Sequence, residues 1–194
     1  EQFPPNGLHL TGIRVLLAPP SPEMAELVTT SGVRKVIEAL RAQHDLVIVD
    51  CSSWFNETTL AILDLADVIL TVMSLEITAI KNMRLFLEVV EQLGYEREKV
   101  QLVLNRADTT LGIRVSDVEH SIGRKVDHQI VSDGRSVVYA LNRGVPLYLS
   151  NREAQVSQDI LRIATALSGE RQPAAAGGDR GKAPQQRKGL FAWR

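Results

Sequence analysis

Four apolar, mostly β-branched residues stand between two aspartates in Asp45-Leu-Val-Ile-Val-Asp50, and this run constrains the fold more than any other stretch. Short continuous apolar runs are typical of strands buried on both faces of a parallel sheet. Ligands of open α/β sheets lie beyond the carboxyl ends of such strands. We therefore predict that Asp50 is a functional carboxylate. The alternative is that it only caps the following turn or helix.

Further strands and amphipathic helices alternate along the chain. Apolar runs predict strands over 13–18, 67–73, 100–104 and 126–131. Apolar periodicity and capping residues predict helices over 31–43, 56–66, 77–93, 136–143 and 153–167, with a short helix opened by a Ser116–Glu119 capping box. This alternation predicts βαβ crossovers, and therefore an α/β fold with a mainly parallel, doubly wound sheet.

Composition bounds the class of protein. The chain has 194 residues, 44% of them hydrophobic, and a net charge of −1, which fits one sizeable soluble domain. Its single cysteine, Cys51, excludes an internal disulfide and indicates a reducing, cytoplasmic compartment. The four histidines and Cys51 lack metal-ligand spacing, so we expect no zinc site.

The composition changes near residue 169, which divides the chain into a domain over 1–168 and a basic tail over 169–194. The tail carries six cations against two acids, which leaves the rest of the chain at −5. It is rich in Ala, Gly, Gln and Pro, so we expect disorder. Its end, Lys188-Gly-Leu-Phe-Ala-Trp-Arg194, is either solvated or anchors to a partner groove or an anionic membrane surface.

Phosphate-loop and nucleophile motifs are absent from the printed sequence. No Gly-x-x-x-x-Gly-Lys-[Ser/Thr], Gly-x-Ser-x-Gly or His-Glu-x-x-His occurs. A phosphate cradle needs successive backbone N–H groups aimed at the anion, and Gly7 and Gly12 are not spaced for one. Ser52 and Ser53 have no histidine at a spacing that predicts a nucleophile and its base.

Five segments nevertheless resemble, in order, the later two-thirds of a MinD/ParA-type P-loop ATPase. They are Val15–Leu27, with its Ala-Pro-Pro-Ser-Pro; Asp45–Asp50, similar to the Walker B strand; Leu63–Val72 with Glu76; Val103-Leu-Asn-Arg106; and Ile130-Val-Ser-Asp133 followed by Val137, Ala140, Gly144 and Pro146. Three shorter segments most resemble the CpaE/TadZ branch, which serves type IVb (Flp/Tad) pilus assembly: Pro20–Glu23, Phe55–Thr59 and Leu104–Asp108.

The resemblance implies an ATP and Mg²⁺ site. Asp50 would hold the Mg²⁺ shell through water, because Mg²⁺ keeps several waters in proteins. Asn105 would bind the adenine edge with its amide, flanked by Arg106 and Asp133. The alternative for these three is an ordinary turn at a strand end. The resemblance also implies a nucleotide-dependent homodimer with pilus-assembly proteins as partners, cytoplasmic and membrane-associated or polar through them.

The sequence departs from the MinD/ParA pattern at three places. The Walker A loop with its two lysines is not in this sequence, Cys51-Ser-Ser-Trp54 replaces Pro-Ala-Gly, and Val131 replaces a proline. We therefore expect a piece of a longer ATPase that lacks the amino-terminal strands and is itself inactive. The strand before the Walker A loop would separate 45–50 from 67–73, so we predict an open slot there. We also predict Asp50 and Asn105 at the same sheet edge.

Several functions remain open at this stage. The first is a weakly hydrolysing ATPase that positions a pilus machine, and the second is a non-catalytic scaffold of the same fold. The third is a partition or cell-division positioning ATPase. The net charge of −5 over residues 1–168 argues against DNA binding, since non-specific binding to nucleic acid needs a basic surface.

Overall fold

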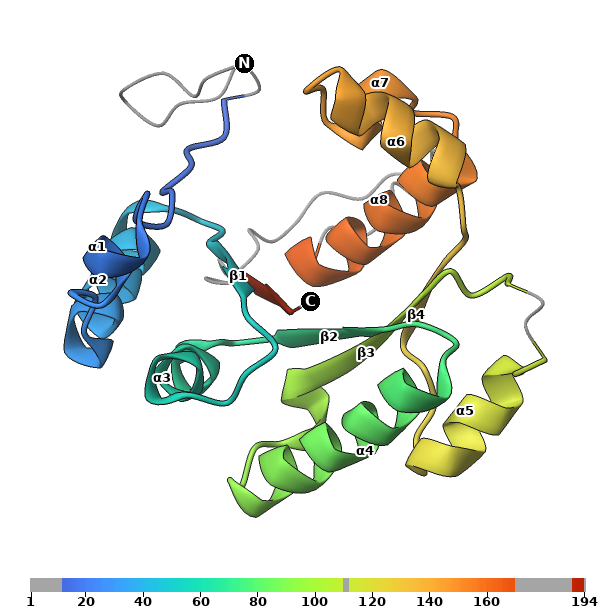
Figure 1. Cartoon of the computed structure of the whole chain (residues 1–194), viewed down its shortest axis with the longest axis horizontal. Helices are drawn as coiled ribbons and strands as arrows, with labels where there is room; N and C mark the ends of the chain where they lie inside the picture. The colour runs from blue at the N-terminus through green and yellow to red at the C-terminus, as the bar shows by residue number, and fades with distance from the viewer. Residues whose placement is uncertain (1–11, 110–111, 170–189, 194) are drawn as a thin grey trace, which may run out of the picture.

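A computed structural model describes residues 12–109, 112–169 and 190–193 (Figure 1). The strands are β1 (Ile48–Cys51), β2 (Ile69–Met73), β3 (Val100–Asn105), β4 (His128–Ile130) and β5 (Leu190–Trp193). The helices are α1 (Pro22–Ala25), α2 (Thr30–Gln43), α3 (Glu57–Leu65), α4 (Ile77–Gln92), α5 (Val115–Ile122), α6 (Gly134–Asn142), α7 (Leu147–Ser150) and α8 (Gln155–Ser168), with a 3-10 turn at Arg97–Lys99. None of the described helices has the length and apolar character needed to cross a bilayer.

The described strands form one parallel sheet in the order β1-β5-β2-β3-β4. Parallel strands end at the same edge, so the carboxyl ends of β1 and β3 share an edge. This confirms the predicted α/β fold with a parallel sheet, and the carboxyl ends of the strands that carry Asp50 and Asn105 point toward one edge of it, as predicted.

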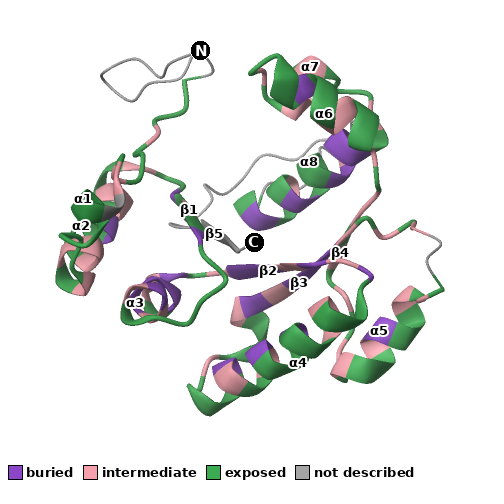
Figure 2. Cartoon of the chain, in the orientation of Figure 1, coloured by how far each residue is buried: buried purple, intermediate pink, exposed green. Residues whose placement is uncertain are grey.

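Helices cover both faces of the sheet (Figure 1). Because side chains alternate along a strand, Leu102 and Leu104 of β3 enter a larger core with residues of α3, α4 and α5. Val103, between them, enters a smaller core with Ile163 and Leu167 of α8. In Figure 2 the buried stretches of the ribbon lie along β2, β3 and the helix faces turned toward them.

Local sequence signals set the helix boundaries near the expected positions. Asn56 caps α3, since its Oδ1 accepts a hydrogen bond from the Thr59 amide at 2.8 Å. Gly94 follows α4 with φ of 75°, a left-handed conformation that ends helices and favours glycine. The apolar stripe of α4 is buried at Met83 and Val90, as its periodicity predicts.

The strand predicted over 13–18 is wrong. Only Arg14 makes an isolated bridge there, and Leu16 and Leu17 are exposed. A strand needs a partner with which to exchange backbone hydrogen bonds, and no described strand runs beside this segment. The apolar run alone was therefore insufficient to define a strand.

The capping box predicted at Ser116 and Glu119 is also wrong, because α5 starts differently. Arg114 is the N-cap, and its amide donates to Asp117 at 3.1 Å. Glu119 instead accepts from the Val126 amide at 3.1 Å and pairs with Lys125 at 2.7 Å. The helix thus begins earlier than predicted. The short α7 was not predicted at all.

Strand β1 is not buried on both faces as its apolar run predicts. Cys51 is buried in the larger core, whereas Leu46 and Ile48 are 48% and 60% exposed. Strand β1 lies at the end of the strand order, where the described helices α2 and α3 pack on the Cys51 face. The opposite face of β1 stays exposed to solvent.

The predicted open slot between 45–50 and 67–73 is filled. Strand β5 lies between β1 and β2, pairing Asp50 with Ala192 and Leu70 with the same Ala192. Residues 190–193 therefore form a strand, which corrects the expected disorder of the tail at these positions; residues 170–189 and 194 lie outside the described part. The unpaired backbone groups of two neighbouring strands favour capture of an extended segment.

Candidate functional site

The turn after β3 presents Asn105 and Arg106 at the carboxyl edge. The Asn105 Oδ1 accepts a hydrogen bond from the Arg106 amide at 3.0 Å, so the amide group of this side chain is held against its own turn. Arg106 has φ of 55°, a left-handed conformation that is uncommon for a residue other than glycine. The Thr109 hydroxyl donates to the Arg106 carbonyl at 2.8 Å and closes the turn.

The loop after β4 lies beside this turn. Asn105 is in register with Ile130, and the Ala107 amide donates to the Ile130 carbonyl at 2.9 Å. Three residues later, Asp133 caps α6 by accepting from the Ser136 amide at 2.9 Å. Hydrogen bonds from the Ser136 amide and hydroxyl lower the pKa of Asp133. The structure thus places Asn105, Arg106 and Asp133 in two adjoining loops.

Two carboxylates that the sequence reasoning assigned no role join these loops. Asp108 accepts from the Ser132 amide at 2.6 Å. Asp159 of α8 is 1% exposed and accepts from the Val131 amide at 2.9 Å. A cavity of about 250 Å³ lies against them, lined by Ala107, Asp108, Gln129, Val131, Gln155, Asp159 and Arg162.

Asp50, near the carboxyl end of β1, lies well behind the edge at which Asn105 stands. The strand registers place it level with Leu70 and Gln101, four positions before Asn105. At about 3.3 Å per residue and about 4.8 Å per strand spacing, Asp50 is about 13 Å behind Asn105 along the strands and about 14 Å from it across them. Asp50 is thus level with the start of β3 and Asn105 stands at its end, so the structure does not bring these two residues together.

The side chains around Asp50 differ in exposure. Asp50 itself is exposed, whereas the neighbouring Cys51 is buried. Burial and, secondarily, the negative charge of Asp50 raise the pKa of Cys51 to about 11, so this thiol stays protonated. No group of three or more His, Cys, Asp or Glu side chains gathers for a metal ion among the described residues. One carboxylate with substrate phosphates suffices for Mg²⁺ in many sites, so Asp50 fits a water-mediated role.

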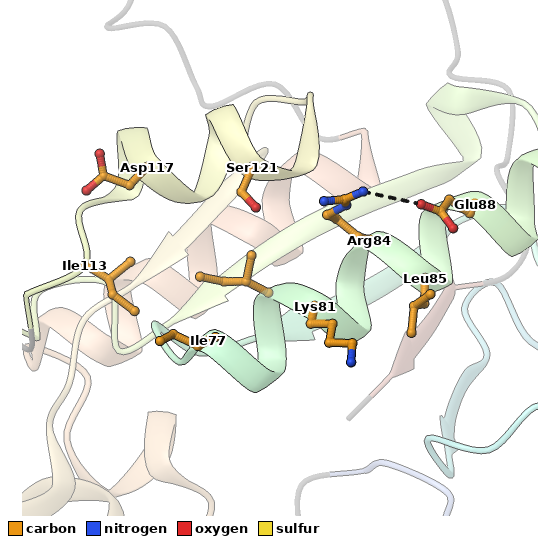
Figure 3. Close-up of a pocket in the computed structure, with 9 residues that line it drawn as sticks. Ile77, Lys81, Arg84, Leu85, Glu88, Ile113, Asp117 and Ser121 are labelled. Carbon is orange, nitrogen blue, oxygen red and sulfur yellow. Dashed lines mark ion pairs between the residues drawn. The ribbon is translucent and has the colours of Figure 1, made fainter.

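A larger cavity of about 490 Å³ lies between α4 and α5, away from these loops (Figure 3). Its apolar lining comes from Ile77, Ile80, Leu85 and Ile113, and its polar lining from Lys81, Arg84, Glu88, Asp117 and Ser121. Arg84 pairs with Glu88 across one helical turn at 3.8 Å, as the dashed line in Figure 3 marks. None of these residues was predicted to belong to the nucleotide site.

Comparison with known proteins yields distant relatives, and no family model matches the chain. The septum site-determining protein MinD of Thermotoga maritima is 20% identical over 153 residues, which are 76% of this chain and 56% of that protein. An uncharacterized ATP-binding protein of Methanocaldococcus jannaschii is 28% identical over 141 residues, 70% of this chain and 52% of that protein. The chain thus spans about half the length of these curated relatives.

Solved structures match over a similar share. A ParA family ATPase from Chlorobium tepidum superposes with a TM-score of 0.70 at 22% identity, over 77% of this chain and 61% of that one. The chain has the MinD/ParA fold. MinD from Pyrococcus horikoshii, complexed with Mg-ADP, superposes with a TM-score of 0.64 at 15% identity, over 76% of this chain and 60% of that one. A chain of the MinC:MinD cell division protein complex of Aquifex aeolicus superposes with a TM-score of 0.63 at 21% identity, over 78% of this chain and 64% of that one. None of these names is that of a pilus-assembly protein, so the CpaE/TadZ assignment rests on sequence segments alone.

Proposed function

We propose that this chain supplies the base-binding side and the metal-side carboxylate of a MinD/ParA-type nucleotide site. The observation that carries the proposal is the pairing of the Asn105–Arg106 turn with the Val131–Asp133 loop at the carboxyl edge of a parallel sheet. Ligands of doubly wound sheets bind at this edge. The proposed ligand is ATP with Mg²⁺.

The proposed roles follow from the chemistry of each side chain. The Asn105 side chain offers the donor Nδ2 and the second lone pair of Oδ1 to the adenine edge, since Oδ1 already accepts from the Arg106 amide. The Arg106 guanidinium offers a planar cation to the face or edge of the base. The Asp133 carboxylate already accepts from Ser136, so its proposed part is to fix the start of α6 beside the base. Asp50, behind this edge and toward β1, would bind Mg²⁺ through water.

The biological role that we favour is nucleotide-dependent positioning of a partner, as a homodimer. The MinD and ParA names of the relatives favour the division or partition setting over pilus assembly. The pilus-machine role of a CpaE/TadZ-type protein is the narrower proposal, and Pro20–Glu23, Phe55–Thr59 and Leu104–Asp108 support it.

A non-catalytic scaffold of the same fold is the second candidate. One observation favours it: the residues after Asp50 are Cys51-Ser-Ser-Trp54 and not the Pro-Ala-Gly that the resemblance leads one to expect. Trp54 in this segment is 77% exposed. An ATP hydrolysis assay on the full-length protein distinguishes the two candidates, because only the ATPase turns over ATP.

Nucleoside binding to this chain tests the base-binding side directly. Adenosine at millimolar concentration should shift the amide resonances of Arg106 and of residues 131–133 in the ¹⁵N-labelled chain. Asn105→Ala should abolish these shifts. The matched control is Asn142→Ala, which removes an exposed asparagine at the end of α6. Shifts that survive in the Asn105 variant would contradict the proposed role of its amide.

Mg-ATP should bind this chain poorly, because its printed sequence contains no phosphate-cradling loop to match the charge of the phosphates. Titration calorimetry measures this. Micromolar binding of Mg-ATP to the chain as printed would show that other residues hold the phosphates.

A further inference from the structure

The loop after β4 is held from two sides by carboxylates of different elements. On one side Asp108, three residues after Asn105, accepts from the Ser132 amide at 2.6 Å. On the other side Asp159 of α8 accepts from the Val131 amide at 2.9 Å. Two consecutive backbone N–H groups of the base-side loop are therefore bound by acids from outside the loop.

Asp159 is the more deeply placed of the two. It is 1% exposed, although an ionised carboxylate is costly to bury unless it is fully hydrogen-bonded. Its oxygens accept from the Val131 backbone amide and from the side-chain Nε2 of Gln155 at 2.8 Å, and it pairs with Arg162. Breaking such a buried set by removing the carboxylate leaves its donors unpaired. This arrangement fixes the distance between α8 and the loop.

Asp108 connects the loop to the other half of the site. It lies in the same short turn as Asn105 and Arg106, so its bond to Ser132 sets the spacing between that turn and the loop that ends at Asp133. A base bound between the turn and the loop requires this spacing to be constant. Two independent carboxylates thus hold one loop in one place.

We propose that Asp108 and Asp159 are positioning residues that set the base selectivity of the site by fixing the Val131–Asp133 loop, and this rests on the proposed function. Neither residue needs to touch the base. Their effect passes through the Val131 and Ser132 amides to the side chains that face the ligand.

Conservative variants separate positioning from general stability. Asp159→Asn keeps an oxygen that accepts from Val131, while Gln155 can turn its amide and the 62% exposed Arg162 can turn to solvent. Asp159→Ala removes the acceptor. The matched control is Ser157→Ala in the same helix, because Ser157 is fully buried and its hydroxyl donates to the Asn151 carbonyl at 2.6 Å, away from the loop.

The experiment compares amide exchange, melting temperature and the ratio of adenosine to guanosine affinity for the ¹⁵N-labelled chain and its variants. Asp159→Ala should speed exchange at Val131, and Asp108→Ala at Ser132, by about tenfold or more, because each amide loses a bond to a charged acceptor. Both variants should lower the adenosine preference. Asp159→Asn and Ser157→Ala should keep the adenosine preference, even if Ser157→Ala lowers the melting temperature as much as Asp159→Ala does.

Each result decides the proposal. A base preference that follows melting temperature in all variants, Ser157→Ala included, would overturn it, as would unchanged exchange at Val131 and Ser132. If the unsubstituted chain binds no nucleoside, the proposed function is refuted, and the selectivity role falls with it. Amide exchange at Val131 and Ser132 still shows in that case whether the two acids hold the loop. Should Asp159→Ala not fold, the exposed Asp108 carries the same comparison.

Discussion

Replacing Arg106 by glycine should stabilise the fold and weaken ligand binding together. Arg106 has φ of 55°, and among the described residues it is the one non-glycine with positive φ. Backbone strain of this kind gathers at functional sites, where the side chain is retained for its chemistry. Arg106→Gly keeps the backbone groups that bond to Asn105 and Thr109 and removes only the side chain.

The expected gain follows from two opposing terms. A left-handed conformation costs about 1–2 kcal/mol for a residue with a Cβ. Glycine loses about 0.5–1 kcal/mol more conformational entropy on folding than alanine does. The net gain in the free energy of unfolding is therefore about 0.5–1 kcal/mol, which raises the melting temperature by about 1–4 °C for a domain of this size. Loss of the guanidinium should weaken adenosine binding by about tenfold, the value of one cation–π contact or hydrogen bond.

Thermal melting and the adenosine titration measure the two effects on the same protein. The control is Gly123→Ala, because Gly123 has φ of 67° and open space around its missing Cβ, so strain alone should lower its melting temperature. A lower melting temperature for Arg106→Gly would refute the strain argument. A stabilised variant with unchanged adenosine affinity would refute the assignment of Arg106 to the base.

Three further predictions concern the fold around the site. Asn56→Ala should cost about 1 kcal/mol of stability, measured by urea unfolding, because α3 loses its cap at the Thr59 amide, and an unchanged midpoint would contradict this. Cys51 should react with iodoacetamide at pH 8 about a hundredfold more slowly in the folded chain than in urea, because the pKa of its thiol is raised from 9.0 to about 11; equal rates would show an accessible thiolate. Deletion of residues 190–194 should lower the melting temperature by several degrees, because β1 and β2 lose their shared partner; an unchanged transition would show that β5 is dispensable.

The strong periodic signals predicted the fold well, because burial and hydrogen bonding act there in the same direction. The runs at 67–73 and 100–104 became β2 and β3, whose side chains fill both cores. The run at 13–18 failed because strand formation depends on a partner elsewhere in the chain, which no local pattern contains. The same reason explains β5, whose place depends on the gap between two distant strands.

The placement of the candidate site residues was predictable in part. Strand ends pointed to Asn105, Arg106 and Asp133, and the parallel register explains why the three lie in adjoining loops. Asp159 was missed because the sequence reasoning sought site residues at strand ends, whereas this carboxylate lies within α8. An acid three residues after Val156 and four before Ile163 lies on the buried face of the helix, and that spacing was the available signal.

The central claim is that Asp50 and Asn105 serve one Mg-nucleotide site, Asp50 on its metal side and Asn105 on its base side. Calorimetric affinities for ATP and GTP, with and without Mg²⁺, test it most directly in the full-length protein that the gene encodes. Asp50→Asn should remove the Mg²⁺ dependence and keep the preference for ATP, whereas Asn105→Ala should remove the preference and keep the Mg²⁺ dependence. Identical effects of the two variants, or no effect of either, would contradict the claim.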